Sequence, residues 1–119
     1  MARVLLVDDD AAGLELRKLI LEREGHQILL SGDPVRAREL FSESHPDTVV
    51  LDMRLPEAAD GLALIREFRS AAPDVRIVVL CGWPLDLEGT PEERLVNVAL
   101  SKPIRTAALV SALSNSEPR

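Results

Sequence analysis

Aromatic residues and cysteine are scarce in this sequence, and basic residues are outnumbered by acidic ones. Aromatic residues account for 3% of the 119 residues and tyrosine is absent, so a folded core must consist mainly of aliphatic side chains. The single cysteine, Cys81, excludes an internal disulfide and is consistent with a reducing compartment. The formal net charge of −6 argues against direct binding of nucleic acid, because such binding depends on clustered positive charge.

Long hydrophobic runs are also missing, and no segment approaches the length needed to cross a membrane. The N-terminus leads into a five-residue apolar segment that lacks the cleavage site of a secretory signal. We therefore expect a cytoplasmic protein without membrane contact. A hydrophobic content of 46% indicates a globular chain, and its length suits one domain, which we place at residues 1–114. Residues 115–119 are expected to form a disordered tail.

Short apolar segments alternate regularly with segments of helical periodicity. Strands are predicted at residues 3–7, 27–30, 48–51, 75–80 and 97–100. Helices are predicted at residues 12–24, from Pro34 onward, at 60–70 and at 106–113. This alternation predicts an α/β fold with a parallel five-stranded sheet that helices cover on both faces.

Two of the predicted helices and one irregular segment carry further local signals. The helix over residues 12–24 has Leu16, Leu19 and Ile20 at helical spacing. Asp33 followed by Pro34 is typical of a helix start, with a capping residue before proline at the first helical position. Residues 82–95 contain two glycines and two prolines, which predicts a shortened or irregular fourth helix.

Polar or reactive residues follow four of the predicted strands. Asp8 and Asp9 follow the first strand, Asp52 the third, Cys81 the fourth and Lys102 the fifth. Since the carboxyl ends of parallel strands lie along one edge, three carboxylates would gather there. Each pair would repel by roughly 3 kcal/mol at ~5 Å and an effective dielectric constant of ~20. Lys102 and a hard divalent cation would offset this repulsion. Mg²⁺, or alternatively Mn²⁺, fits this site, because such an ion binds one or two carboxylates and bridges them to a phosphoryl oxygen. Asp52 would then be the nucleophile, since a carboxylate can accept a phosphoryl group.

Three segments together resemble a known family. VLLVDDD, VVLDMRLP and SKP, in this order within the strand–helix alternation, resemble the receiver domain of two-component response regulators over almost the whole chain. The resemblance implies a flavodoxin-like (βα)5 three-layer sandwich with sheet order 2-1-3-4-5. It also implies a phosphorelay signalling switch. Such a domain is not an enzyme in the ordinary sense, although it catalyses its own phosphorylation and dephosphorylation.

The resemblance also implies roles for the acidic residues. Asp52 would be the phosphoacceptor, and the donor would be a phosphohistidine on a sensor histidine kinase or a histidine phosphotransfer protein. Asp8, Asp9 and Asp52 would bind Mg²⁺ together with the backbone carbonyl of Arg54. No direct nucleic-acid contact by this chain is expected, and we expect a monomer or a weak homodimer.

Two positions near the fourth and fifth strands depart from the family pattern. Lys102 would contact the phosphoryl group, and its peptide bond to Pro103 would be cis. Cys81 stands where the family usually has a serine or threonine whose hydroxyl contacts the phosphoryl group, and a thiol is a weaker donor. Ala99 stands where an aromatic residue usually turns inward on activation. These departures leave a second hypothesis open, a receiver-like interaction module with weak or absent phosphorylation-dependent switching.

Arg54 and Trp83 match positions that tune phosphoryl lifetime in the family. Their size would hinder an attacking water molecule, so we predict slow autodephosphorylation. A third class, a metal-dependent phosphatase or a flavin carrier, is disfavoured by two absences. No second acid follows Asp52 at close spacing, and no glycine-rich phosphate loop follows the first strand.

Overall fold

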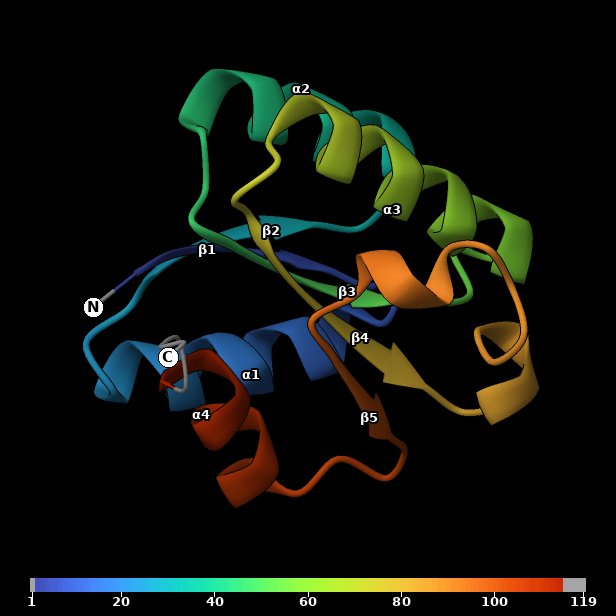
Figure 1. Ribbon diagram of the computed structural model, residues 1–119. Helices are drawn as coiled ribbons and strands as arrows, with labels where there is room; N and C mark the ends of the chain where they lie inside the picture. Colours follow the sequence, from blue (N-terminus) through green and yellow to red (C-terminus); the bar gives the residue numbers. More distant parts are fainter. Residues whose placement is uncertain (1, 115–119) are drawn as a thin grey trace.

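The computed structural model describes residues 2–114, which fold around one five-stranded parallel sheet (Figure 1). The strands are β1 (Arg3–Val7), β2 (Gln27–Ser31), β3 (Thr48–Asp52), β4 (Arg76–Cys81) and β5 (Val98–Ser101). The α-helices of this region are α1 (Ala11–Arg23), α2 (Pro34–Ser44), α3 (Ala58–Ala71) and α4 (Thr106–Ser114). The sheet order is β2-β1-β3-β4-β5, which confirms the predicted flavodoxin-like fold. The tail predicted at residues 115–119 lies outside the described residues.

Helices cover both faces of the sheet and give the molecule three layers. Figure 1 shows α2 and α3 on one face and α1 and α4 on the other. One core cluster joins the sheet to α2 and α3, and a second joins it to α1 and α4. The central strand β3 is buried along its whole length. Because successive side chains of a strand point to opposite faces, Val49 and Leu51 enter the first cluster and Val50 the second.

The predicted helix start at Asp33 is present. The Asp33 side chain accepts a hydrogen bond from the backbone N–H of Arg36 at 2.8 Å, and Pro34 is the first helical residue. Helix α3 begins at Ala58, two residues before the predicted start, because a capping box stabilises its first turn. In that box the backbone N–H of Glu57 donates to the Asp60 carboxylate at 2.9 Å.

The buried face of α1 differs from the one that the leucine spacing suggests. Leu16 and Leu19 are 60% and 58% exposed, whereas Leu14 and Leu21 are buried. The spacing therefore indicated a helix but not its inner face. Leu14 and Leu21 are seven residues apart, two helical turns, and both pack in the cluster formed with α4.

Two short 3₁₀ turns replace a full helix between β4 and β5, as the glycines and prolines predicted. These turns are η1 (Pro84–Asp86) and η2 (Glu93–Leu95). Polar contacts from α3 hold this connection: Arg66 pairs with the buried carboxylate of Glu92 at 2.6 Å, and Arg69 donates to the carbonyl of Leu95 at 2.9 Å. Among residues 2–114, no helix combines the length and apolar character that a membrane crossing requires.

Candidate functional site

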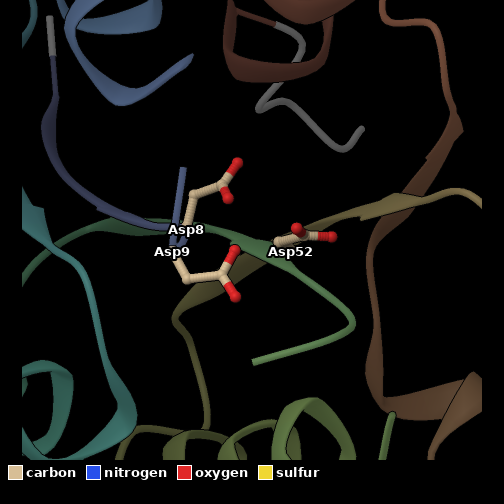
Figure 2. Close-up of side chains that lie close together, drawn as sticks. All are labelled: Asp8, Asp9 and Asp52. Atoms are coloured by element: carbon tan, nitrogen blue, oxygen red, sulfur yellow. The ribbon is translucent and has the colours of Figure 1, made fainter. Parts of the chain in front are cut away.

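Three carboxylates meet where β1 and β3 end (Figure 2). Asp8 and Asp9 follow β1, and Asp52 is the last residue of β3, the neighbouring strand. One oxygen from each side chain lies within 4.8 Å of the others. Asp8 and Asp52 are buried and Asp9 is exposed, so the cluster opens to solvent on one side. Parallel pairing of adjacent strands therefore brings together acids that are more than 40 positions apart in the chain.

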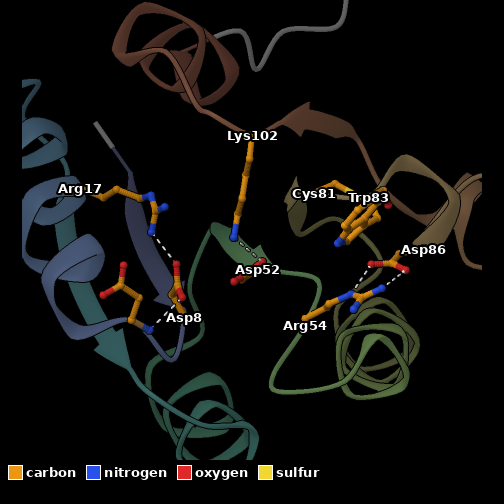
Figure 3. Close-up of polar contacts among 9 residues, drawn as sticks. Asp8, Arg17, Asp52, Arg54, Cys81, Trp83, Asp86 and Lys102 are labelled. Atoms are coloured by element: carbon orange, nitrogen blue, oxygen red, sulfur yellow. Dashed lines mark hydrogen bonds and ion pairs between the residues drawn. The ribbon is translucent and has the colours of Figure 1, made fainter.

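Lys102 supplies a positive charge to this cluster. It follows β5 directly, and its backbone N–H donates to the carbonyl of Cys81 at the end of β4 at 2.9 Å. Its Nζ lies 3.0 Å from Oδ1 of Asp52, as Figure 3 shows. The side chain of Asp52 is 9% exposed and that of Lys102 is 37% exposed. The ammonium group thus reaches a buried carboxylate from a position that solvent can still enter.

Burial dominates the electrostatics of Asp52. Removal from water raises the pKa of this carboxyl group, and the negative charges of Asp8 and Asp9 raise it further, while the hydrogen bond and the charge of Lys102 lower it. The net rise shows that the resident positive charge does not fully offset burial and repulsion. A cluster in that condition favours the uptake of another cation.

The donor chemistry of the cluster fits Mg²⁺ or Mn²⁺. Carboxylate oxygens are hard ligands, and these ions bind to one or two carboxylates while keeping several water molecules. The exposed side at Asp9 leaves room for such waters. Arg54, whose backbone carbonyl was the fourth predicted ligand, lies in the loop that leads from β3 to α3.

Sequence reasoning missed a second positive charge at the cluster. Arg17 of α1 places Nη1 2.6 Å from Oδ2 of Asp8, and the two side chains are 17% and 4% exposed. Figure 3 shows Arg17 directed toward Asp8. The backbone N–H of Asp10 donates to the other oxygen of Asp8 at 3.0 Å. No local motif indicates this contact, because it depends on which face α1 turns toward the sheet.

Cys81 and Trp83 lie at the end of β4. The Cys81 side chain is buried, and its thiol donates to the backbone carbonyl of Trp83 at 2.9 Å. Burial raises the pKa of this thiol, so it is held as a neutral group. The Trp83 side chain is 64% exposed, and therefore it does not cover Asp52 as a closed lid in this structure.

Arg54 is held by a partner that the sequence did not reveal. Its Nε and Nη2 donate to the two carboxylate oxygens of Asp86 in η1 at 2.8 and 3.0 Å. This bidentate pair lowers the pKa of Asp86. It joins the loop after β3 to the connection after β4, and Figure 3 shows the guanidinium directed toward Asp86.

The residue at the position of the expected aromatic switch lies in the wall of a hollow. Ala99 of β5 is exposed and borders a hollow of about 300 Å³ between β4, β5 and the two 3₁₀ turns, with Cys81 and Leu87 also in its wall. The peptide bonds Leu55–Pro56 and Lys102–Pro103 are both cis.

Comparison with known proteins agrees with this fold and site. The model of the response regulator receiver domain family matches residues 4–114, and the chain belongs to this family. Such domains are signalling domains rather than classical enzymes, and they interact with histidine kinases in general.

Individual relatives differ in how much of their length matches. The chain is 41% identical over 78 residues to the response regulator MprA of Mycobacterium sp. (strain KMS). The aligned region covers 66% of this chain and 34% of that protein. The chain thus spans about a third of that relative's length.

Two solved structures match almost completely. The receiver domain protein from Clostridium thermocellum has a TM-score of 0.88 and 26% identity over 97% of this chain and 93% of that one. The response regulator TrrA from Thermotoga maritima, solved in complex with Mg(2+)-BeF, has a TM-score of 0.86 and 25% identity over 96% and 97% of the two chains.

Proposed function

We propose that this receiver domain, residues 1–114, accepts a phosphoryl group on Asp52 from a phosphohistidine of a sensor histidine kinase or a histidine phosphotransfer protein. The observation that carries the proposal is the 3.0 Å ion pair between Lys102 and a buried Asp52, beside two further carboxylates. A single acid at a strand end has many uses. Asp52 has an ammonium group on one side and two carboxylates on the other. This arrangement suits the acceptance of a negatively charged phosphoryl group that arrives with a bound metal ion.

The transfer requires a free carboxylate oxygen on Asp52. One oxygen of Asp52 attacks phosphorus, the bond between phosphorus and the donor imidazole nitrogen breaks, and its electron pair returns to the imidazole. The product is an aspartyl phosphate and a histidine. Lys102 holds Oδ1 of Asp52, which orients the carboxylate and leaves its second oxygen for attack. The same ammonium group then faces the phosphoryl oxygens, whose charge it stabilises.

Asp8, Asp9 and Asp52 would hold Mg²⁺, or Mn²⁺ in its place, together with the backbone carbonyl of Arg54. The bound ion supplies positive charge to the phosphoryl oxygens. The chain itself positions the acids on two neighbouring strands, so the metal ligands and the attacking group keep one geometry. TrrA, the relative solved with Mg(2+)-BeF, supports this use of the acidic cluster.

Cys81, Arg54 and Trp83 would act after transfer. Cys81 is the last residue of β4 and would contact the phosphoryl group. Its thiol donates to the Trp83 carbonyl in this structure, and a thiol is a weak donor. Arg54 and Trp83 would slow the attack of water on the aspartyl phosphate. Arg54 would do so from a fixed position, because Asp86 holds its guanidinium.

Phosphorylation by a small donor tests the proposal. The protein is incubated with acetyl phosphate and MgCl₂, and intact mass spectrometry measures the gain of one phosphoryl group. We expect the gain in the wild type and in Asp74→Asn, which removes an exposed carboxylate elsewhere, and its loss in Asp52→Asn, in Asp52→Ala and with excess chelator. A gain that persists in both Asp52 variants would show that another residue is the acceptor.

A second function, a protein-interaction module without phosphorylation-dependent switching, is favoured by one observation. The expected switch position is Ala99 beside a hollow, so no aromatic side chain is present there to change position. Hydrogen exchange of residues 82–101 before and after phosphorylation distinguishes the two functions. A switch predicts altered exchange in the phosphorylated protein, and a passive module predicts none.

Under either function we propose a monomer or weak homodimer located in the cytoplasm, with no nucleic-acid contact by these residues.

A further inference from the structure

The contact between Arg17 and Asp8 is unusual because it is shielded from water. The separation is 2.6 Å, and the side chains are 17% and 4% exposed. Both carboxylate oxygens of Asp8 have partners. Oδ2 pairs with the Arg17 guanidinium, and Oδ1 accepts a hydrogen bond from the backbone N–H of Asp10. An ion pair in such surroundings is screened less than one on the surface, so it competes strongly for the carboxylate.

Gly13 leaves space beside the Arg17 guanidinium. A Cβ atom at Gly13 would lie 3.2 Å from Nη1 of Arg17 and 3.0 Å from Oδ2 of Asp10. Both distances are tighter than ordinary van der Waals contact. Gly13 lies inside α1, where glycine is less favourable than alanine. The helix therefore carries an unfavourable residue at the point where the guanidinium passes toward Asp8.

The charge balance of the cluster follows from these contacts. Asp8, Asp9 and Asp52 bring three negative charges, while Lys102 and Arg17 bring two positive ones. Each cation holds a different acid, and the acid held by Arg17 is one of the proposed metal ligands. A divalent ion that binds here meets a site from which most of the negative charge has already been neutralised.

We infer that Arg17 is a built-in competitor for the metal, which occupies Asp8 and sets how much Mg²⁺ the receiver needs before it can be phosphorylated. This inference rests on the proposed function of the acidic cluster. In the metal-free protein Arg17 stabilises Asp8, so the domain tolerates its crowded acids. When Mg²⁺ binds, the guanidinium must release Oδ2 of Asp8 or share it, and this cost weakens metal binding. Arg17 is thus a residue that determines metal affinity and not a catalytic residue.

Isothermal titration calorimetry with MgCl₂ at constant ionic strength tests the inference directly. Arg17→Ala should bind Mg²⁺ at least about tenfold more tightly than the wild type, because a positive charge a few ångströms from a divalent ion opposes it strongly. Arg17→Gln retains an N–H donor for Asp8 and guards against a variant that fails to fold. It should also bind more tightly, because the charge is lost. Arg23→Ala removes the same charge from an exposed position in the last turn of α1 and should leave the affinity unchanged.

Thermal unfolding supplies a second readout that does not depend on phosphorylation. In chelator, Arg17→Ala should melt below the wild type, because Asp8 loses its partner. Saturating Mg²⁺ should then raise its melting temperature by more than it raises that of the wild type, because tighter binding to the native state stabilises it more.

The outcomes separate the inference from the proposed function. If the wild type binds Mg²⁺ and both Arg17 variants bind it equally or more weakly, Arg17 does not compete and the inference is overturned. Wild-type affinity in Arg17→Gln alone would also overturn it, since that would assign Arg17 a purely hydrogen-bonding role. If only the Arg17 variants bind Mg²⁺, the inference holds and the proposed metal use of the wild-type site fails. If no form binds the ion, both fail.

Discussion

The two halves of the strand-end edge are built very differently. On the β1–β3 side, β3 is buried throughout, and two of the three acids, Asp8 and Asp52, are buried while Asp9 is exposed. On the β4–β5 side, the edge strand β5 alternates between partly buried and exposed residues. Two 3₁₀ turns replace a helix, and a hollow of about 300 Å³ borders Ala99. The first half is where we propose that the phosphoryl group is accepted. The second has alanine at the position where the resemblance leads us to expect an aromatic residue.

This difference suggests that the chemistry and its transmission can be altered separately. A group buried in the central strands keeps its geometry because many neighbours would have to move with it. Edge strands and short turns open at lower free energy, so they are where a conformational response would be expected. A receiver with a complete acidic side and a depleted β4–β5 side would accept the phosphoryl group and transmit it weakly.

The largest expected effect concerns the contact that joins the two halves. Lys102→Ala removes the ammonium group 3.0 Å from Asp52, and the rate of phosphorylation by acetyl phosphate should fall by about a hundredfold, the usual cost of losing one transition-state charge contact. Intact mass spectrometry over time measures the rate. Lys18→Ala, at the chain's only other lysine, is the control. A rate within a few fold of the wild type would show that the β4–β5 side contributes little to the chemistry.

The buried thiol at the end of β4 should show a pH dependence. Burial raises the pKa of Cys81, so the native state holds the neutral thiol more firmly than the unfolded state does. Alkylation by iodoacetamide near neutral pH should therefore be at least about tenfold slower in native than in urea-unfolded protein. Stability should fall as the pH rises above 9.0, the ordinary value, because the unfolded state then loses its proton first.

Cys81→Ser serves as the control for that pH dependence. The variant should lose this part of the decline in the urea midpoint at high pH, since a hydroxyl does not titrate there. Rapid alkylation of the native wild type would show instead that the end of β4 opens often, which would sharpen the contrast with the buried β3 side.

A smaller effect is expected for the residues that would shield the aspartyl phosphate. Trp83→Ala and Arg54→Ala should each accelerate loss of the phosphoryl group by about fivefold, because water reaches the phosphorus more easily. The loss is followed by mass spectrometry after removal of the donor. Leu85→Ala, an 81% exposed neighbour in η1, should leave the rate unchanged. Loss within seconds in the wild type itself would argue against any shielding.

The smallest expected effect is at the hollow. Ala99→Tyr should raise the free energy of unfolding by about 0.5 kcal/mol, because tyrosine favours strands and its ring would cover apolar surface along the hollow. Urea denaturation measures this change, and Ala99→Ser is the control for a small side chain without apolar area. Destabilisation by Ala99→Tyr would mean that the hollow cannot accept a ring, and that the departure at this position is matched by its surroundings.

Local patterns predicted the sheet and its chemistry well. Residues 48–51 were predicted to form a strand of a sheet that helices cover on both faces, and β3 is buried along its whole length. The glycines and prolines of residues 82–95 predicted a shortened or irregular helix between β4 and β5, and two 3₁₀ turns lie there. These predictions succeeded because each depends on a few consecutive residues whose preferences agree with the tertiary structure.

Predictions that depended on helix orientation and on long side chains did less well. The leucine spacing in α1 did not identify its buried face, since Leu14 and Leu21 are inward while Leu16 and Leu19 face solvent. A helix rich in leucine offers several apolar faces, and packing against β1 and α4 selects one. The partners of Arg17 and Arg54 were missed for a related reason, because arginine reaches many positions and only packing limits them.

The sequence by itself determined which residues end the strands, and therefore that Asp8, Asp9, Asp52 and Lys102 share one edge of a parallel sheet. This followed because strand formation is local and parallel strands align their ends. Only the tertiary structure decided which cation meets which acid: Lys102 holds Asp52, Arg17 holds Asp8 and Asp86 holds Arg54. Those pairings depend on helix rotation and side-chain reach across elements, and charges interact strongly only within a few ångströms.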